Sequence, residues 1–119
     1  MRSDGTHIRD YVHVDDVVSG YMKLAKVSQE KELDGEAFNF SRNEPLSVKA
    51  LYEFICKATV GNYVEPKILN TAKSEIKDQH LNSAKAETVL GWSSSVPIAE
   101  GLSKTVDWYR SYLHGNLNI

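Results

Sequence analysis

The sequence predicts an α/β fold of short strands and about four helices, in one domain that spans residues 1–119. Two patterns carry this prediction. Short segments of β-branched and aromatic residues alternate with longer stretches in which apolar residues recur at helical spacing. A chain of this length can form one core, and no internal repeat or long linker divides it. Residues 114–119 are expected to be frayed.

Three segments have the composition of strands. Residues 9–14 are rich in β-branched and aromatic residues, and residues 66–70 form a second candidate. Residues 37–40 follow a charged stretch that predicts a solvated loop. In this segment the alternation of side chains places Phe38 and Phe40 on one face.

Two helices are predicted in the first half of the chain. Asp15 or Asp16 can cap a helix that ends near Val27, and Ser47 can cap a helix that ends near Gly61. The apolar stripe of the first helix is expected to consist of Val17, Val18, Tyr21, Leu24 and Ala25.

Two more helices are predicted in the second half. Asn82 or Ser83 caps a short helix that ends at Leu90, and Gly91 suits the left-handed turn that follows. A helix over residues 97–113 begins with a proline, which fits the first turn. Its apolar residues are expected to be Ile98, Leu102, Val106, Trp108, Tyr109 and Leu113.

Composition narrows the possible partners. The net charge of -2 argues against a nucleic-acid or anionic-membrane surface, because such partners usually need clustered Lys and Arg. The longest apolar run is too short to span a membrane, and residues 1–5 lack the apolar core of a signal peptide. The single cysteine, Cys56, cannot form an internal disulfide and favours a reducing cytoplasm. Its apolar neighbours favour a buried, unreactive thiol.

Residues 5–18, which read GTHIRDYVHVDDVV, form the most informative motif. They resemble a segment from the second half of the extended short-chain dehydrogenase/reductases (SDRs), the NAD-dependent sugar-nucleotide epimerases and dehydratases. The resemblance implies that Arg9 reaches the substrate's diphosphate, and a guanidinium fork matches paired phosphate oxygens. From the residues alone, a salt bridge from Arg9 to Asp10 or Asp15 is the alternative. Asp15 and Asp16 are interpreted as capping residues rather than as a metal or acid/base pair.

Two further segments carry the resemblance. Residues 36–41, EAFNFS, resemble the family's aromatic-Asn-hydrophobic-Gly/Ser strand end, which implies that Asn39 lies near the nucleotide; fixing a loop is its alternative role. Residues 74–86 resemble a segment where many members carry a second phosphate-binding arginine, but no arginine occurs here. Lys77 is the nearest basic replacement, or Lys73 under a shifted alignment. A lysine offers only a compact charge.

The resemblance extends from about residue 3 to residue 113. Lys85-Ala86 with Leu90-Gly91-Trp92 matches a family packing signature, and the last predicted helix resembles the family's closing helix, with Trp108 and Tyr109 as core or edge aromatics. His80 is expected to be an exposed loop residue. The sequences of residues 9–16, 38–41 and 76–81 most resemble the corresponding segments of CDP-glucose 4,6-dehydratases.

The resemblance implies NAD in the complete enzyme, yet the chain lacks a Gly-x-x-Gly-x-x-Gly turn. It also lacks a usable Tyr-x-x-x-Lys pair, since Pro66 would break the helix needed to bring Tyr63 and Lys67 together. We therefore expect no catalytic residue, cofactor site or metal site, and no turnover by the chain alone. The chain resembles the C-terminal, substrate-binding part of such an enzyme without its Rossmann half.

The expected partners are a nucleotide-sugar ligand and a separate or missing N-terminal Rossmann half, with no nucleic acid and no membrane. Apolar surface that such a half would cover predicts self-association. The leading hypothesis is the substrate-binding part of a cytoplasmic CDP-glucose-type 4,6-dehydratase. The alternatives are a 4-epimerase, a free-standing nucleotide-sugar binding or regulatory module, and an inert truncated fragment.

Overall fold

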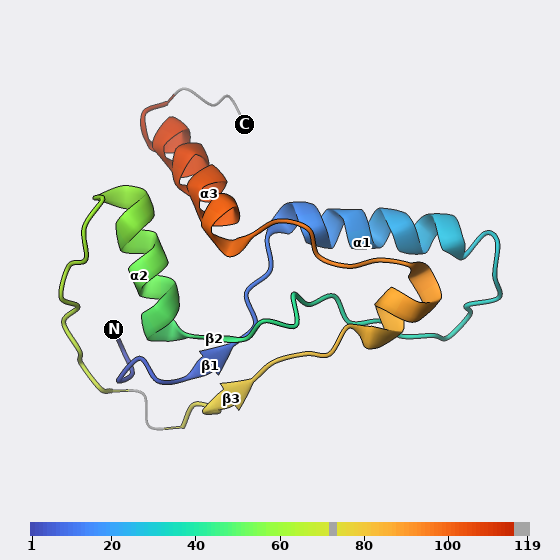
Figure 1. Cartoon of the computed structure of the whole chain (residues 1–119), viewed down its shortest axis with the longest axis horizontal. Helices are drawn as coiled ribbons and strands as arrows, with labels where there is room; N and C mark the ends of the chain where they lie inside the picture. Colours follow the sequence, from blue (N-terminus) through green and yellow to red (C-terminus); the bar gives the residue numbers. More distant parts are fainter. Residues whose placement is uncertain (72–73, 116–119) are drawn as a thin grey trace.

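The computed structural model describes residues 1–71 and 74–115. These residues form a small three-stranded sheet, three α-helices and one π-helix, spread as a flat plate 50 × 39 × 21 Å (Figure 1). The radius of gyration is 17.3 Å. A compact globule of this length has a radius of about 14 Å. The chain is therefore more extended than its length requires, and its single-domain organisation stays a prediction.

The sheet is built from very short strands. Its central strand β1 (Ile8–Arg9) pairs antiparallel with β2 (Leu46–Ser47) and parallel with β3 (Asp78–Gln79). The predicted strand over residues 9–14 was therefore mostly wrong: pairing stops at Arg9, and the chain turns into the first helix.

The other two predicted strands were also wrong, because residues 37–40 and 66–70 do not form strands. Phe38 and Phe40 are nevertheless half-buried while Asn39 between them is exposed, so the predicted alternation is confirmed. The alternating pattern reports burial against a core, which needs no neighbouring strand.

The helices follow the sequence more closely. Helix α1 (Val14–Val27) was predicted, but its cap is His13, whose Nδ1 accepts a hydrogen bond from the Asp15 backbone N–H at 3.2 Å. Asp15 and Asp16 were thus wrongly predicted as caps; they lie within the first helical turn, where acidic groups favour the helix dipole.

The positions of the remaining three helices are confirmed. Helix α2 (Val48–Thr59) is capped by Ser47, whose Oγ accepts from the Ala50 backbone N–H at 3.1 Å. The π-helix η1 (Ala86–Leu90) ends at Gly91, which adopts a left-handed φ of 64°. Helix α3 (Ile98–Leu113) begins directly after Pro97. The predicted caps Asn82 and Ser83 were wrong for η1, because its N-cap position is Lys85 and carries no side-chain cap; Asn82 Oδ1 instead accepts from the Ala84 backbone N–H at 2.8 Å, just before η1.

The apolar stripe predicted for α1 was partly wrong. Val18 and Tyr21 are 54% and 63% exposed, and the most buried positions on this helix include Asp16 and Gly20. Gly20 lies directly against the ring of Phe40: a Cβ there would be 2.8 Å from a ring carbon. The absence of a side chain at residue 20 therefore allows α1 to approach Phe40 closely, and this orientation turns the larger apolar residues outward.

The core lies between α1, η1 and the 38–40 segment. Its buried members are Val27, Ala86, Leu90 and Trp92. The rings of Trp92 and Phe40 meet edge to face, with centroids 4.8 Å apart. The packing role predicted for Leu90 and Trp92 is confirmed, and Cys56 is a buried free thiol as predicted.

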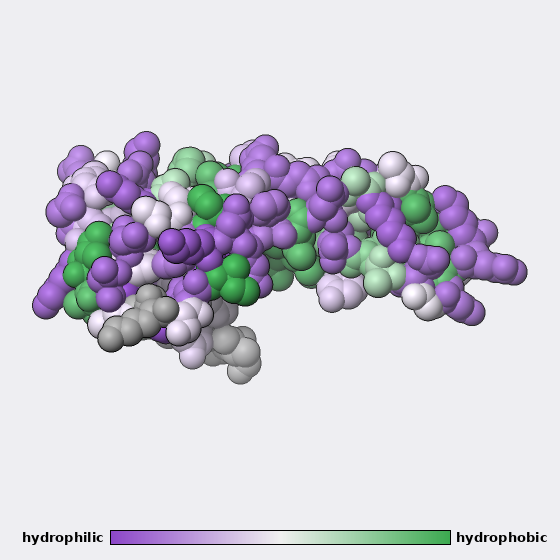
Figure 2. Space-filling model, turned by 90° about the horizontal axis from the view of Figure 1, so that it is seen from below, coloured by the Kyte–Doolittle hydropathy of each residue, from purple (hydrophilic) through white to green (hydrophobic). Residues whose placement is uncertain are grey.

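A second packing region joins α2 to α3, but much of α3 remains uncovered. Trp108 and Tyr109 are 46% and 54% exposed, so of the two predicted roles, core or edge aromatic, the core role is excluded. Figure 2 shows hydrophobic residues exposed among hydrophilic ones on the lower face. No helix in the described residues is long and apolar enough to cross a membrane. Residues 114 and 115 form a turn, and residues 116–119 lie outside the described part of the chain.

Candidate functional site

Arg9 lies on the central strand of the sheet, with its side chain 24% exposed. Its Nη1 donates to the carbonyl oxygen of Ile8 at 2.7 Å, and its Nη2 forms an ion pair with Oε2 of Glu75 at 3.5 Å. The sequence-based alternative named the wrong acidic partners. Asp10 instead accepts a hydrogen bond from the Leu81 backbone N–H, and Asp15 pairs with Lys104.

Lys77 lies immediately before β3, beside Arg9. The Ile8 backbone N–H donates to the carbonyl oxygen of Lys77 at 2.8 Å, and the Lys77 side chain is exposed. Nearby, hydrogen bonds from Thr6 lower the pKa of the Asp4 carboxyl, with smaller contributions from the charges of His7 and Lys77. The structure thus places Lys77 next to the strand that carries Arg9. Lys73, the alternative to Lys77, lies outside the described residues.

Asn39 lies against the segment that follows β3. Its side chain is exposed, and its Nδ2 makes one long contact of 3.5 Å to the carbonyl oxygen of Asn82. The segment between β3 and Asn82 connects the two areas, because the Leu81 backbone N–H donates to Oδ2 of Asp10 at 3.0 Å. Asn39 therefore contacts a loop, and it keeps a carbonyl oxygen and a second N–H for a ligand.

A shallow cleft of about 310 Å³ opens on this surface, lined by Asn43, Pro45, His80, Leu81 and Asn82. His80 is exposed as predicted, and its Nδ1 lies 2.8 Å from Oδ1 of Asp78. Asn43 has a left-handed φ of 56°, and its Oδ1 accepts from the Ser83 backbone N–H at 3.1 Å. The cleft is open to solvent, so it forms only one wall of a candidate site.

Burial raises the pKa of the Tyr11 hydroxyl, and the nearby Arg9 guanidinium acts in the opposite direction. Tyr11 therefore stays protonated at neutral pH. In the described residues no group of three or more His, Cys, Asp or Glu side chains is placed to hold a metal ion. The chemistry that this surface offers is the binding of an anion and of hydrogen-bonding groups.

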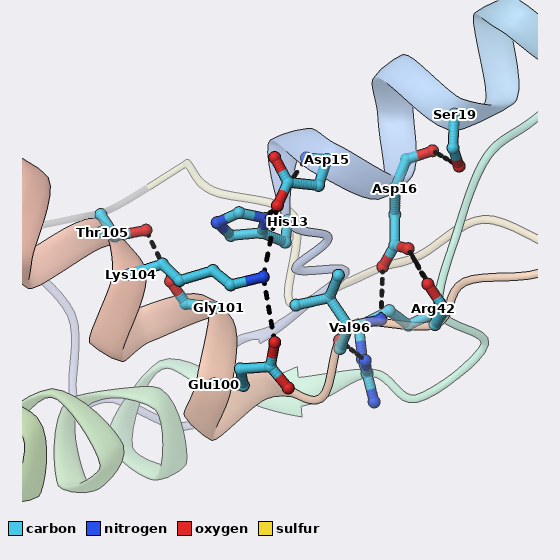
Figure 3. A network of polar contacts seen from close by, with 11 residues as sticks. His13, Asp15, Asp16, Ser19, Arg42, Val96, Glu100, Gly101, Lys104 and Thr105 are labelled. Atoms are coloured by element: carbon cyan, nitrogen blue, oxygen red, sulfur yellow. Dashed lines mark hydrogen bonds and ion pairs between the residues drawn. The ribbon is translucent and has the colours of Figure 1, made fainter.

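Sequence reasoning missed the buried carboxylate of Asp16. Figure 3 shows Asp16 pointing from α1 toward the segment that precedes α3. The Asp16 side chain is 1% exposed and accepts hydrogen bonds from the backbone N–H and Oγ of Ser95, at 2.8 and 3.0 Å, and from the Val96 backbone N–H at 3.1 Å. Arg42 donates to the Val96 carbonyl oxygen from the other side. No local signal reveals this clamp, because Asp16 and Ser95 are 79 residues apart.

A second groove, of about 520 Å³, separates the start of α1 from α3, and its lining includes Trp108. Lys104 reaches across it to Oδ2 of Asp15 at 3.4 Å and lies 3.0 Å from Oε1 of Glu100 (Figure 3). The hydrogen bond to Glu100, followed by the contact to Asp15, raises the pKa of Lys104. One ammonium faces two carboxylates, so these groups carry a net negative charge and the groove is a less suitable anion site than the Arg9 surface.

Comparison with known proteins identifies related sequences, although no protein-family model matches the chain. UDP-glucose 4-epimerase of Mycolicibacterium smegmatis is 33% identical over 108 residues, which cover 91% of this chain and 33% of the relative. dTDP-glucose 4,6-dehydratase of Streptomyces griseus is 26% identical over 112 residues, which cover 94% and 33% of the two chains. The chain thus spans about a third of the length of these curated relatives.

Solved structures match the fold. UDP-glucose 4-epimerase from Thermotoga maritima, solved with UDP-glucose, is 33% identical with a TM-score of 0.81, over 95% of this chain and 35% of that one. UDP-glucuronic acid 4-epimerase from Bacillus cereus, in complex with UDP-glucuronic acid and NAD, is 25% identical with a TM-score of 0.83, over 94% and 35%. The predicted fold class, the small α/β C-terminal region of such enzymes, is confirmed.

Proposed function

We propose that this chain, which is related to the sugar-nucleotide epimerases and dehydratases of the extended SDR family, is the substrate-binding C-terminal part of such an enzyme. Arg9 binds the diphosphate of the nucleotide sugar, and Asn39 and Lys77 assist. The observation that carries the proposal is the placement of Arg9 on the central strand with Lys77 directly before the neighbouring strand, where its carbonyl oxygen accepts from the Ile8 backbone N–H, because two nearby cations suit one dianionic group.

The three residues have different tasks. The Arg9 fork can donate two parallel hydrogen bonds to phosphate oxygens and so orient the diphosphate. Lys77 adds a compact positive charge beside it. The Asn39 amide can donate and accept at once, which suits a nucleotide base or ribose. All three bind and orient substrate, and none is proposed to move a proton.

We propose NAD as the cofactor of the complete enzyme, where it would accept a hydride from the sugar and return it. The residues of this chain do not fit that cofactor, since the sequence has no Gly-x-x-Gly-x-x-Gly turn. Tyr63 and Lys67 do not lie on a helix, so their spacing does not form an acid/base pair. We therefore propose that the chain alone does not turn over substrate.

The sequence wording favours a CDP-glucose-type 4,6-dehydratase, a lyase that oxidises the sugar at C4, eliminates water across C5 and C6, and then reduces the product. A 4-epimerase is the second candidate. Its support is the identity of 33% to UDP-glucose 4-epimerases, compared with 26% to a dTDP-glucose 4,6-dehydratase. Both candidates need the same diphosphate contact, so the choice of sugar and base distinguishes them.

A partner is part of the proposal. The exposed apolar residues on α1 and α3 include Val14, Val18, Met22, Trp108 and Tyr112. An N-terminal Rossmann half, supplied by the rest of the protein or by a separate chain, would cover apolar surface of this kind. Without it, we expect self-association through the same residues.

The test is a titration of the purified chain with CDP-glucose, UDP-glucose and GDP-mannose, followed by two-dimensional amide NMR. We expect shifts around Arg9, Asn39 and Lys77, and about tenfold weaker binding by Arg9→Gln, because a charge-assisted hydrogen bond is lost. Lys26→Gln, on the exposed end of α1, is the matched control for loss of one charge. The proposal would be refuted by a folded chain that binds none of the three ligands. It would also be refuted by an Arg9→Gln variant that binds with the affinity of the unmodified chain.

The same titration separates the other hypotheses. Restored activity on adding an N-terminal half would support the enzyme part, whereas binding without any such activity would favour a free-standing module. A folded chain without any ligand would indicate an inert fragment. Preference for CDP-glucose would favour the dehydratase assignment, and preference for UDP-glucose would favour the epimerase.

A further inference from the structure

We infer that Arg2 is the second guanidinium of the diphosphate site, and that Glu75 occupies the site of the anion when no ligand is bound. The inference rests on the proposed function of Arg9. Its starting observation is that one carboxylate, that of Glu75, contacts the guanidiniums of both Arg2 and Arg9.

The geometry comes from one carboxylate and two guanidiniums. Nη2 of Arg2 lies 3.3 Å from Oε1 of Glu75, and Nη2 of Arg9 lies 3.5 Å from Oε2 of the same carboxylate. The two arginines therefore contact different oxygens of one planar anion. A carboxylate held this way stands in for two oxygens of a phosphate, which guanidinium groups recognise in the same bridging manner.

The position of Arg2 is set by its backbone, although its side chain is 77% exposed. The Thr71 backbone N–H donates to the carbonyl oxygen of Arg2 at 2.7 Å, and the Leu69 backbone N–H donates to that of Met1 at 2.8 Å. Gly5 turns the chain after Arg2 with a left-handed φ of 84°. These hydrogen bonds hold the backbone of residues 1–2 against residues 69–71. They therefore fix the position from which the Arg2 side chain reaches Glu75.

Arg2 is better placed than Lys77 to share an anion with Arg9. A second phosphate contact needs a group that reaches the same anion as Arg9, and Arg2 already does so through Glu75. Lys77 has no such shared contact, and its charge acts on Asp4. Lys77 then contributes to the local positive potential, whereas Arg2 and Arg9 bracket the ligand.

The Glu75 carboxylate should also lower the affinity of the same site for its ligand. A diphosphate must displace the carboxylate before it can contact both arginines, so the negative charge of Glu75 competes with the ligand. Exposed ion pairs are weak, which makes this competition modest and readily reversed by a better anion. Removing the charge of Glu75 should therefore raise affinity, whereas removing Arg2 should lower it.

The experiment measures binding of UDP-glucose, CDP-glucose and inorganic pyrophosphate to the full chain by calorimetry. We expect Glu75→Gln to bind about fivefold more tightly than the unmodified chain, since the competing ion pairs are lost. We expect Arg2→Gln to bind about tenfold more weakly. Asp107→Asn and Lys26→Gln are charge-matched controls on distant exposed positions, expected to bind within about twofold of the unmodified chain. Amide spectra confirm that each variant is folded.

The outcomes distinguish this inference from the proposed function. If Arg9→Gln weakens binding while Arg2→Gln and Glu75→Gln behave like their controls, the inference is wrong and the proposed function stands. If the unmodified chain binds nothing and Glu75→Gln binds pyrophosphate, the inference is supported directly. If neither folded protein binds any of the three ligands, both ideas fail.

Discussion

Replacement of Asp16 by alanine should strongly destabilise the chain. The carboxylate is buried, and its oxygens accept from the backbone N–H groups of Ser95 and Val96, at 2.8 and 3.1 Å. A hydrogen bond to a charged group contributes about 1.5–3 kcal/mol, and the Ser95 hydroxyl can turn to water. Loss of the two backbone contacts therefore costs about 3–5 kcal/mol. A small domain has about 5–15 kcal/mol in total.

The assay is urea unfolding followed by fluorescence of Trp92. This indole is buried, and its Nε1 donates to Oγ of Ser19 at 2.8 Å, on the same helix as Asp16. A Trp108→Phe background removes the signal of the exposed second tryptophan. With a urea slope of about 1–3 kcal/mol per molar, Asp16→Ala should lower the midpoint by roughly 2 M.

Asp15→Ala is the matched control for this experiment. Asp15 is the neighbouring residue, its side chain is 57% exposed, and its contact to Lys104 is a surface ion pair. Such a pair contributes less than about 1 kcal/mol. If Asp16→Ala unfolds within about 0.5 kcal/mol of Asp15→Ala, the clamp between α1 and the segment before α3 does not stabilise the fold as argued.

Three further predictions follow from particular contacts. A Cβ at Gly101 would lie 2.9 Å from the His13 ring, so Gly101→Ala should cost about 1–3 kcal/mol and lower the melting temperature by several degrees; an unchanged calorimetric transition would contradict this. Hydrogen bonds from Thr6 lower the Asp4 pKa from 3.8, so the stabilisation is complete above that pH and is lost as the pH falls through the lower folded value. The difference in unfolding free energy between the unmodified chain and Asp4→Asn should therefore shrink in acid, and a constant difference would count against it. Trp108→Lys should reduce self-association in sedimentation experiments, because it places a charge on the exposed face of α3. Unchanged self-association would show that Trp108 takes no part in the contact.

The helices were predictable because their signals are local. Ser47 caps α2 through a contact three residues away, Gly91 ends η1, and Pro97 precedes α3. His13 escaped prediction because an imidazole is an uncommon cap, while two aspartates beside it have the usual side chain for that role.

The strands were not predictable from composition, because each has only two residues and pairing depends on distant partners. Residues 37–40 have a strand-like pattern but pack on Trp92 through Phe38 and Phe40. Conversely, β3 is formed by Asp78 and Gln79, which are polar and exposed. Its pairing with β1 supplies the hydrogen bonds, so neither hydrophobic alternation nor β-branching marks it.

The candidate site was predictable in its residue types and not in its contacts. Arg9 could be singled out from its motif, but its partner Glu75 is 66 positions away in the sequence, and the choice among acidic residues is made by the fold. The same holds for Arg2, whose position depends on backbone contacts to residues 69–71. Local reasoning identifies a cation, whereas the three-dimensional arrangement decides which charges meet.

The extended shape and the open site have one physical explanation. The chain spans about a third of its relatives, and its radius of gyration of 17.3 Å exceeds the roughly 14 Å of a compact globule. Val18 and Tyr21 on α1 and Trp108 on α3 are about half exposed or more, although the sequence pattern predicts that they are buried. A helix face with an apolar pattern that is exposed to solvent is the kind of surface that the proposed N-terminal half would cover. The cleft lined by Asn43, His80 and Asn82 is also open to solvent, and under the proposed function the same N-terminal half would form its second wall.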